Sequence, residues 1–478
     1  MQPLSYREIR FALLSLGLIR DCLGFSLPQT NGSSSECCGP GSTLGRAYLL
    51  TRNRHLAGVY ALRTQPVFCG RNSKGRYALR IPAIPRTCAK LYFVLPGVYI
   101  QVPFCQSKCT YCHFATGVFP GELISAYVDA VTDEIRNHRQ QYAAANLALP
   151  AEPPDTIYLG GGTPSLLAPG DLSRILGAVR ESFPSSPWRE LTLEADPETV
   201  TPEKSVAWGT AGINRVSLGA QSFSDSELRA AGRRHRAADI SGAVATLRAA
   251  GLASLNLDLI LGLAGQTYDS WRHSLESLLA LRPEHISIYM LDVDEDSHLG
   301  SELLSGGTRY RAALVPDEDS QSDWFEGACV LLSSAGYEHY EISNWALPGH
   351  RAIHNSKYWQ REPYFGFGSG AHSFNGAERW ANPHDPAAYI EAMRTGRPHI
   401  EQRQRVTPQM ALEEEVFLGL RLLDGISLSH IEHIYGVNLR PRLPHLLEAG
   451  AVALDGDVLR LQPTRLSVSN EVFAELLA

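Results

Sequence analysis

Beyond residue 97 the chain alternates between short apolar runs and longer amphipathic segments. The apolar runs, which predict six β-strands, lie at residues 98–102, 156–159, 191–195, 215–218, 255–261 and 286–290. In one of the segments between them, Ile240, Val244 and Leu247 share a helical face, and Gly251 follows as a stop signal. Strands that alternate with helices predict an α/β domain with a parallel sheet over residues 94–335. In such a sheet, functional side chains gather at the carboxyl ends of the strands.

The pattern changes after about Ala335. The expected elements are a helix at 407–423, shorter helices at 428–434 and 443–447, and a β-hairpin at 452–461. Thr407 can cap the first of these helices, and Pro408 suits its first turn. Residues 336–478 are therefore expected to be a separate C-terminal region that ends in a helical, winged-helix-like module. Such a wing can bind DNA, but residues 436–478 hold four Arg against five acidic residues, which favours a packing role.

Residues 1–93 differ from the rest, since they show neither a helical nor a strand period. They hold 13 Lys and Arg but only three acidic residues, and a stretch rich in Ser, Gly and Pro occupies 31–42. A basic arm or a targeting segment fits this composition. A disordered tail, or translation from a misplaced start, fits it better, because the segment cannot build a core.

Composition narrows the possible functions. The formal net charge of −7 provides no general basic field for nucleic acid. No apolar run approaches the roughly 18 residues of a membrane-spanning helix. The cysteines do not form a disulfide framework, because Cys105, Cys109 and Cys112 stand together and only Cys329 follows them. These features predict a cytoplasmic protein with a metal site.

The cysteine triplet, Cys105-Gln-Ser-Lys-Cys109-Thr-Tyr-Cys112, follows directly on the first predicted strand. A 4Fe-4S cluster usually takes four thiolates, one for each iron. Three thiolates leave one iron open, and an open iron can chelate the amino and carboxylate groups of a ligand. The alternatives are a zinc ion, which needs four ligands and could recruit His113, or three ordinary buried thiols. The close spacing favours the cluster.

With Tyr111 before its last cysteine, this C-x3-C-x2-C motif resembles the signature of the radical S-adenosylmethionine (SAM) family. Its surroundings are similar, in order, to oxygen-independent coproporphyrinogen III oxidases over roughly residues 94–478. The matching segments are Tyr99–Cys105, Gly160–Ser165, Glu194, Ser217–Phe223, Gly232-Arg233 and Asp258–Leu263. The resemblance implies a partial (β/α)6 radical SAM barrel that is followed by a C-terminal module.

The resemblance also implies roles for individual residues. Cys105, Cys109 and Cys112 would ligate the cluster, Gly161, Gly162 and Thr163 would contact SAM, Glu194 would bind its ribose, and Tyr99 and Tyr111 would surround it. Gln221, Arg233 and Asp258 would face the same cavity. A structural ion pair inside the barrel is the alternative role for Arg233 and for Asp258. Glycines after a strand suit a binding site because they let backbone groups approach a ligand closely.

The segment His354-Asn-Ser-Lys-Tyr358-Trp359 matches the H-N-x-x-Y-W pattern of the heme-chaperone (HemW) subfamily. The resemblance extends through residues 366–373, Arg379 and Asn382. It implies heme binding near His354, since histidine is a competent axial ligand of heme iron. Tyr358 and Trp359 can lie on a porphyrin face.

The combined expectation is a heme chaperone that binds heme, a 4Fe-4S cluster and SAM and passes heme to an acceptor such as a respiratory protein. The alternatives are a coproporphyrinogen III oxidase that uses a 5′-deoxyadenosyl radical and a relative of the heme-opening radical methyltransferases. The oxidase carries a further cysteine where this chain has Phe114, so the chaperone is favoured over an enzyme. Gln101, His113 and Ala264 also depart from the family pattern, although none of them is a cluster ligand.

Overall fold

The computed structural model describes residues 94–478 except 113, 115, 295–296, 397–398, 467–468 and 478. The expectations for residues 1–93 and for His113 concern positions outside the described residues. The six predicted strands are all present, as β1 (Gly97–Val102), β2 (Thr156–Gly161), β3 (Glu190–Ala195), β4 (Arg215–Gln221), β5 (Ser254–Leu261) and β6 (His285–Met290). They pair in sequence order, and every pair is parallel. The predicted parallel α/β sheet is therefore confirmed.

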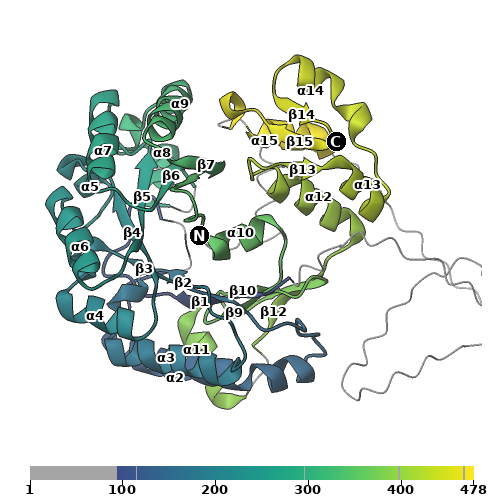
Figure 1. Ribbon diagram of the computed structural model, residues 1–478. Helices are drawn as coiled ribbons and strands as arrows, with labels where there is room; N and C mark the ends of the chain where they lie inside the picture. The colour runs from purple at the N-terminus through teal and green to yellow at the C-terminus, as the bar shows by residue number, and fades with distance from the viewer. Residues whose placement is uncertain are drawn as a thin grey trace, which may run out of the picture. The chain divides into compact units, whose positions relative to one another are not determined.

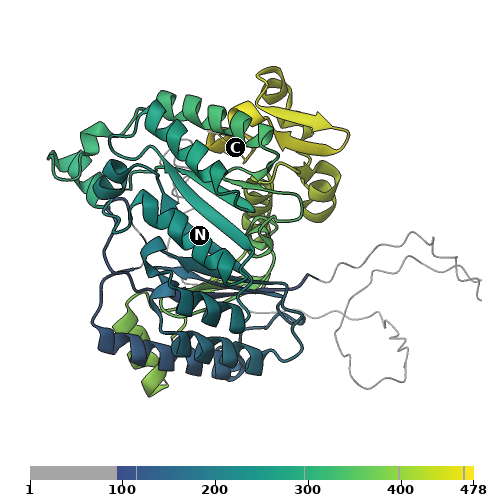
Figure 2. The ribbon, with the colours of Figure 1, turned by 60° about the vertical axis from the view of Figure 1, so that its left-hand side comes forward.

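Helices cover the outer side of these strands, as Figures 1 and 2 show. They are α2 (Gly121–Ala144), α3 (Pro169–Ser182), α4 (Pro202–Thr210), α5 (Asp225–Ala230), α6 (Ala237–Ala249) and α7 (Tyr268–Ala280). The predicted apolar face of α6 is buried, since Ile240, Val244 and Leu247 all belong to the main hydrophobic core.

The two sides of the strands differ in polarity. On β3, Leu191 and Leu193 belong to the core, whereas Thr192 and Glu194 alternate with them. Successive side chains of a strand point to opposite faces, so the apolar positions pack under the helices and the polar positions face the inner side of the curved sheet. The same alternation along β5 brings Asp258 to the inner side. This inner side is where the candidate site lies.

The sheet continues beyond the six predicted strands and has 12 strands in the order β12-β11-β10-β9-β1-β2-β3-β4-β5-β6-β8-β7. The added strands are β7 (Glu338–Glu341), β8 (Asn344–Ala346), β9 (Tyr364–Phe367), β10 (His372–Phe374), β11 (Glu378–Ala381) and β12 (Glu401–Arg405). Among the described residues β7 and β12 remain edges, so the sheet stays an open, partial barrel. The added strands are too short to show a period in the sequence, and β9 pairs parallel with β1 from far along the chain.

Four helices accompany this second half of the sheet: α8 (His298–Ser305), α9 (Glu318–Ser334), α10 (Ile353–Trp359) and α11 (Pro386–Thr395). Helix α10 contains the H-N-x-x-Y-W segment and lies on the inner side of the strands (Figure 1). It packs against β2 and against the C-terminal module.

The C-terminal module has the predicted helices and hairpin. Its elements are α12 (Pro408–Gly419), β13 (Ile426–Ser427), α13 (Leu428–Tyr435), α14 (Pro444–Glu448), β14 (Val452–Asp455), β15 (Val458–Leu461) and α15 (Ser469–Leu477). Thr407 caps α12, as expected, through its side-chain oxygen and the Met410 N–H. The helix ends at Gly419 rather than at Leu423, because the Leu423 N–H donates to the Tyr340 carbonyl and draws the chain toward β7. Along the described residues, no helix is both long and apolar enough to cross a membrane.

Candidate cluster and cofactor site

The cysteine loop begins at the carboxyl end of β1. The Cys105 N–H donates to the Gly117 carbonyl at 2.9 Å, which closes the loop on itself. Farther along, the Thr110 N–H donates to the Ala231 carbonyl at 3.1 Å, and the Ser107 hydroxyl donates to the Gly232 carbonyl at 3.4 Å. These bonds fasten the loop to the segment that follows α5. All three cysteines remain partly exposed.

The surroundings of the thiols matter for metal binding. Burial raises the pKa of Cys105 to about 11 and also raises the pKa of Cys112. The Arg233 guanidinium donates to Cys109 Sγ at 3.5 Å. A thiolate is deprotonated when it binds a metal, and a nearby cation stabilises its charge. The loop therefore provides three thiols, and Arg233, from the segment after α5, places a positive charge beside Cys109.

The ligands considered above for a zinc ion include His113, which lies outside the described residues. A structural zinc ion needs ligands that converge on one point. Among the described residues, no three His, Cys, Asp or Glu side chains converge closely enough to hold a single ion. A 4Fe-4S cluster takes one thiolate for each iron. Cys329 is on α9 and packs against the hydrophobic core. The residues present thus fit a cluster with three cysteine ligands.

The glycine loop after β2 lies beside the cysteine loop. The Gly162 N–H donates to the Val102 carbonyl and the Thr163 N–H to the Phe104 carbonyl, both at 2.8 Å. A Cβ atom on Gly162 would lie 2.7 Å from the Phe104 oxygen, so this close approach requires glycine. Gly161 has a φ of +106°, a conformation that also favours glycine. The loop therefore brings glycine backbone next to the cysteine loop.

Glu194, at the end of β3, is held toward this loop. Its Oε1 accepts a hydrogen bond from the Tyr158 hydroxyl at 2.7 Å, and its Oε2 accepts one from the Gly161 N–H at 3.0 Å. Both carboxylate oxygens are thereby oriented. A carboxylate fixed in this way can accept further hydrogen bonds from the hydroxyl groups of a ribose.

Arg233 joins three parts of the site. It forms an ion pair with Asp196, donates to the Gly219 carbonyl at 3.1 Å and reaches Cys109. Burial opposes the charge of this guanidinium, but Asp196, Tyr111 and Cys109 together outweigh it, so the pKa of Arg233 is raised. The ion-pair alternative for Arg233 therefore applies, with Asp196 as the partner, at the edge of the cluster loop. Gln221, at the end of β4, adopts a φ of +64°, which is unusual for a residue other than glycine.

The remaining residues predicted to lie near SAM are Asp258, Tyr111 and Tyr99. Asp258 accepts hydrogen bonds from Ser217 at 3.0 Å and Asn256 at 2.7 Å, and burial raises its pKa. It does not form an ion pair with Arg233. Tyr111 packs against the small cluster of Ala231, Ile260 and Leu263, and Tyr99 stacks on Tyr158.

The H-N-x-x-Y-W segment lies at the other end of the strands. His354 is 0% exposed, and its Nδ1 is 2.8 Å from the hydroxyl of Thr156, the first residue of β2. Its Nε2 is 2.7 Å from the Tyr358 hydroxyl. Glu190, the first residue of β3, accepts hydrogen bonds from the backbone N–H groups of Ile353 and His354. Burial lowers the pKa of His354 well below its ordinary value, so the imidazole is neutral.

Trp359 follows Tyr358 in α10 and is also buried, with the guanidinium of Arg421 4.4 Å from the centroid of its ring. The structure thus brings together the cysteines, the glycine loop, Glu194, Gln221 and Arg233 at the carboxyl ends of the strands. It places His354, Tyr358 and Trp359 at the amino ends.

Sequence reasoning assigned no individual role to several side chains of this site, and it noted Gln101 only as a departure from the family pattern. Tyr158, Asp196, Ser217, Asn256 and Gln101 all contact predicted residues. Four of them, Tyr158, Ser217, Asn256 and Gln101, are polar positions within otherwise apolar strands. The alternation of polar and apolar residues along each strand would have identified those four.

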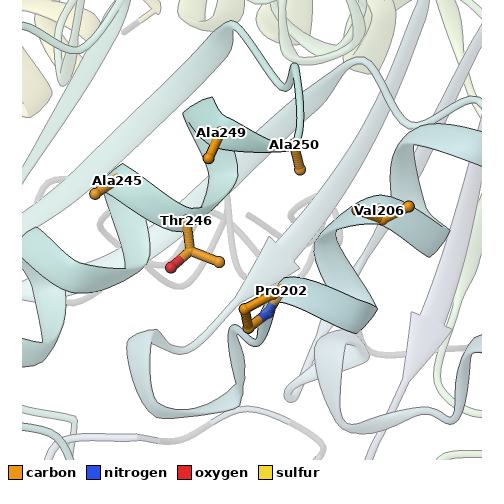
Figure 3. A pocket seen from close by; sticks show the side chains of 6 residues that line it. All are labelled: Pro202, Val206, Ala245, Thr246, Ala249 and Ala250. Carbon is orange, nitrogen blue, oxygen red and sulfur yellow. The ribbon is translucent and has the colours of Figure 1, made fainter.

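A pocket of about 350 Å³ lies elsewhere, between α4 and α6 on the outer helical layer (Figure 3). Its lining consists of Pro202, Val206, Ala245, Thr246, Ala249 and Ala250. These side chains provide no ionisable group, and none of them belongs to the cysteine or glycine loops. The pocket is separate from the candidate site.

Comparison with known proteins matches two parts of the chain to family models. Residues 99–278 match the radical SAM superfamily, and residues 406–464 match the HemN C-terminal domain. The heme chaperone HemW of Bacillus subtilis (strain 168) is 32% identical over 389 residues, which are 80% of this chain and 99% of that protein. The heme chaperone HemW of Escherichia coli (strain K12) is 36% identical over 277 residues, which are 58% of this chain and 69% of that protein.

A solved structure shares the fold. Coproporphyrinogen III oxidase (HemN) from Escherichia coli, a radical SAM enzyme, aligns with 81% of this chain and 91% of its own, with a TM-score of 0.68. The sequence identity is 21%, so this likeness shows the fold alone.

Proposed function

The chain belongs to the HemW family of radical SAM proteins, and from this membership we propose that it is a heme chaperone. It would bind heme, a 4Fe-4S cluster and SAM and would transfer heme to an acceptor protein. The observation that carries the proposal is the match to the Bacillus subtilis relative, which extends over 99% of a protein named for this function.

The carboxyl ends of the strands would hold the cluster and SAM. Cys105, Cys109 and Cys112 are proposed as the three protein ligands, which leaves one iron open for the amino and carboxylate groups of SAM. Gly161, Gly162 and Thr163 would place backbone beside the bound molecule, and Glu194 would accept hydrogen bonds from its ribose. Tyr99, Tyr111, Gln221, Arg233 and Asp258 would line the surrounding cavity.

Heme is proposed to bind through the H-N-x-x-Y-W segment. A neutral imidazole is the form that ligates iron, and His354 is held in this form. Its two ring nitrogens are engaged by Thr156 and Tyr358, so ligation requires that one of these hydrogen bonds breaks. Tyr358 and Trp359 would then be free to lie on the porphyrin. His372, at the start of β10, is the second candidate ligand.

We further propose that residues 94–335 act as the radical SAM core, and that residues 336–478 provide the heme segment and the packing module. We propose that the acceptor is a protein that can be reached from the cytoplasm, such as a respiratory protein. The oxidase alternative is not favoured, because the exposed Phe114 occupies the position of the oxidase's additional cysteine.

Heme uptake by anaerobically purified protein tests the proposal. We expect a shift of the Soret band on addition of heme, a weaker shift in His354→Ala, and an intact cluster in both. His430→Ala, which removes a half-exposed histidine of the C-terminal module, is the matched control and should bind heme normally. Incubation with coproporphyrinogen III, reductant and SAM should yield no protoporphyrinogen. Repeated turnover of that substrate, or the absence of heme uptake, would contradict the proposal.

A further inference from the structure

Between the two ends of the strands, a continuous set of contacts joins the H-N-x-x-Y-W segment to the residues proposed to bind SAM. Tyr158, on β2, lies at its centre and is 3% exposed. We propose that Tyr158 is a positioning residue, which orients Glu194 for SAM and rests on His354, so that the two sites influence each other through it. The coupling rests on the proposed function, because it takes His354 as a heme ligand.

The first contact orients the carboxylate. The Tyr158 hydroxyl donates to Glu194 Oε1 at 2.7 Å, opposite the bond from the Gly161 N–H to Oε2. Gly160 has no side chain and therefore leaves room for the Tyr158 ring and the Glu194 carboxylate. A Cβ atom on Gly160 would be 2.8 Å from Cε1 of Tyr158 and 3.0 Å from the Glu194 carboxyl carbon. The backbone of the glycine loop and the tyrosine hydroxyl therefore fix Glu194 together.

The second set of contacts fixes the tyrosine ring. It stacks on Tyr99 with a centroid distance of 6.1 Å and an angle of 22° between the rings. It also stacks on the His354 imidazole, with a centroid distance of 5.3 Å and an angle of 29° between the rings. Tyr99 in turn donates to Gln101, which lies against Gly161 of the glycine loop. The Tyr158 ring thus contacts one residue of the SAM site and one residue of the heme segment.

Heme and SAM therefore require different arrangements of Tyr158 and its neighbours. If the His354 imidazole leaves its place to ligate iron, Tyr158 loses one of its two stacking partners, and its bond to Glu194 is less well held. Heme capture at His354 should therefore weaken SAM binding. Because binding free energies are reciprocal, SAM should weaken heme binding by the same factor.

Removal of the Tyr158 hydroxyl tests the positioning role. In cluster-loaded Tyr158→Phe protein we expect SAM to bind about tenfold more weakly, since a hydrogen bond to a charged group is lost. The ring remains, so the cluster absorbance without SAM should not change. Tyr337→Phe is the matched control, because it removes a buried hydroxyl that donates to the Pro283 carbonyl at 2.7 Å, away from the site. A SAM affinity of Tyr158→Phe that equals the Tyr337→Phe value would overturn the role.

Two substitutions at His354 test the coupling. His354→Phe keeps a ring against Tyr158 but cannot ligate iron, so heme uptake should fall while SAM affinity stays near the wild-type value. His354→Ala removes the ring, and SAM affinity should fall by about fivefold, as expected for a lost aromatic contact. In the Tyr158→Phe background the same alanine change should have a smaller effect. An identical effect in both backgrounds would overturn the coupling.

Heme-loaded protein separates this inference from the proposed function. Wild-type protein that takes up no heme would contradict the chaperone proposal, while Tyr158→Phe would still decide the positioning role. In protein that does take up heme, SAM should bind several-fold more weakly than in heme-free protein. Equal SAM affinities with and without heme would overturn the coupling even if the chaperone proposal holds.

Discussion

At the carboxyl ends of the first strands the chain forms loops with partly exposed thiols and backbone, whereas at the amino ends it buries charged groups in close contact with one another. Cys105, Cys109 and Cys112 are all partly exposed. At the opposite end, Asp155 and Glu190 are 1% and 5% exposed. In parallel α/β sheets the carboxyl end typically carries chemistry and the amino end stability. This molecule follows that division, although its proposed heme segment lies at the stable end.

The stable end is built around Lys357, inside the H-N-x-x-Y-W segment. Its Nζ is 2.9 Å from Asp155, 3.1 Å from Glu362 and 2.7 Å from the Leu95 carbonyl. Lys357 therefore joins α10 to the residues that precede β1 and β2, through the Leu95 carbonyl and Asp155. Variants at each end of the sheet test this contrast.

Loss of a cluster cysteine should have an all-or-none effect. Replacement of Cys105, Cys109 or Cys112 by Ala should abolish the absorbance of the cluster and its change on addition of SAM, because each iron ligand is needed. Cys329→Ala, on α9, is the control and should leave both signals intact. If Cys329→Ala also removed the cluster, a fourth protein thiolate would be indicated and no iron would remain open for SAM.

At the amino end, the main effect should be on stability. Lys357→Met leaves Asp155 buried without its main partner, and we expect the free energy of unfolding to fall by about 3 kcal/mol. Denaturant unfolding measures this. Arg394→Met breaks the exposed pair with Glu391 and should cost less than about 1 kcal/mol. Equal losses in the two variants would show that the amino end is not the stable end.

Within the carboxyl end, the glycine loop should affect binding rather than assembly. The Cβ of Gly162→Ala would meet the Phe104 carbonyl oxygen, so the loop must shift, and SAM affinity should fall at least about tenfold. Gly170→Ala is the control, because nothing lies within 4 Å of its Cβ position. Isothermal titration of cluster-loaded protein compares the two variants. Loss of the cluster in Gly162→Ala would mean instead that the loop is needed for assembly.

Glu134, which accepts a hydrogen bond from the Gly368 N–H just after β9, should make the stability depend on pH. Burial raises the pKa of this carboxyl from 4.5 to about 7, and it accepts bonds from Gly368, Asn382 and Tyr389. The folded protein therefore holds the proton more tightly than the unfolded chain. The free energy of unfolding should fall as the pH rises from about 4.5 to about 7.

Glu134→Gln removes this titration, so its unfolding free energy should change less over the same pH interval. Denaturant midpoints at several pH values measure the slope. A wild-type protein that became more stable as the pH rose through this interval, with the same slope in the variant, would contradict the prediction.

Local sequence patterns were sufficient to predict many of the elements of this molecule. Six strands, the α6 face, the Thr407 cap and the terminal hairpin follow from residues close together in the sequence, and all are present. The nearness of the cysteine and glycine loops was also predictable, because both follow neighbouring parallel strands whose carboxyl ends share an edge. The early end of α12 was not, because it depends on contacts with β7.

By itself, the sequence determined which segments become strands and which loop carries the thiols, because period and spacing are local properties. Only the tertiary structure decided that β9 pairs with β1, that Arg233 takes Asp196 as its partner, and that His354 contacts Thr156. These contacts join residues far apart along the chain, 198 positions in the case of His354 and Thr156. They form only when strand pairing and helix packing bring both partners to the same end of the sheet, and no local pattern encodes that choice.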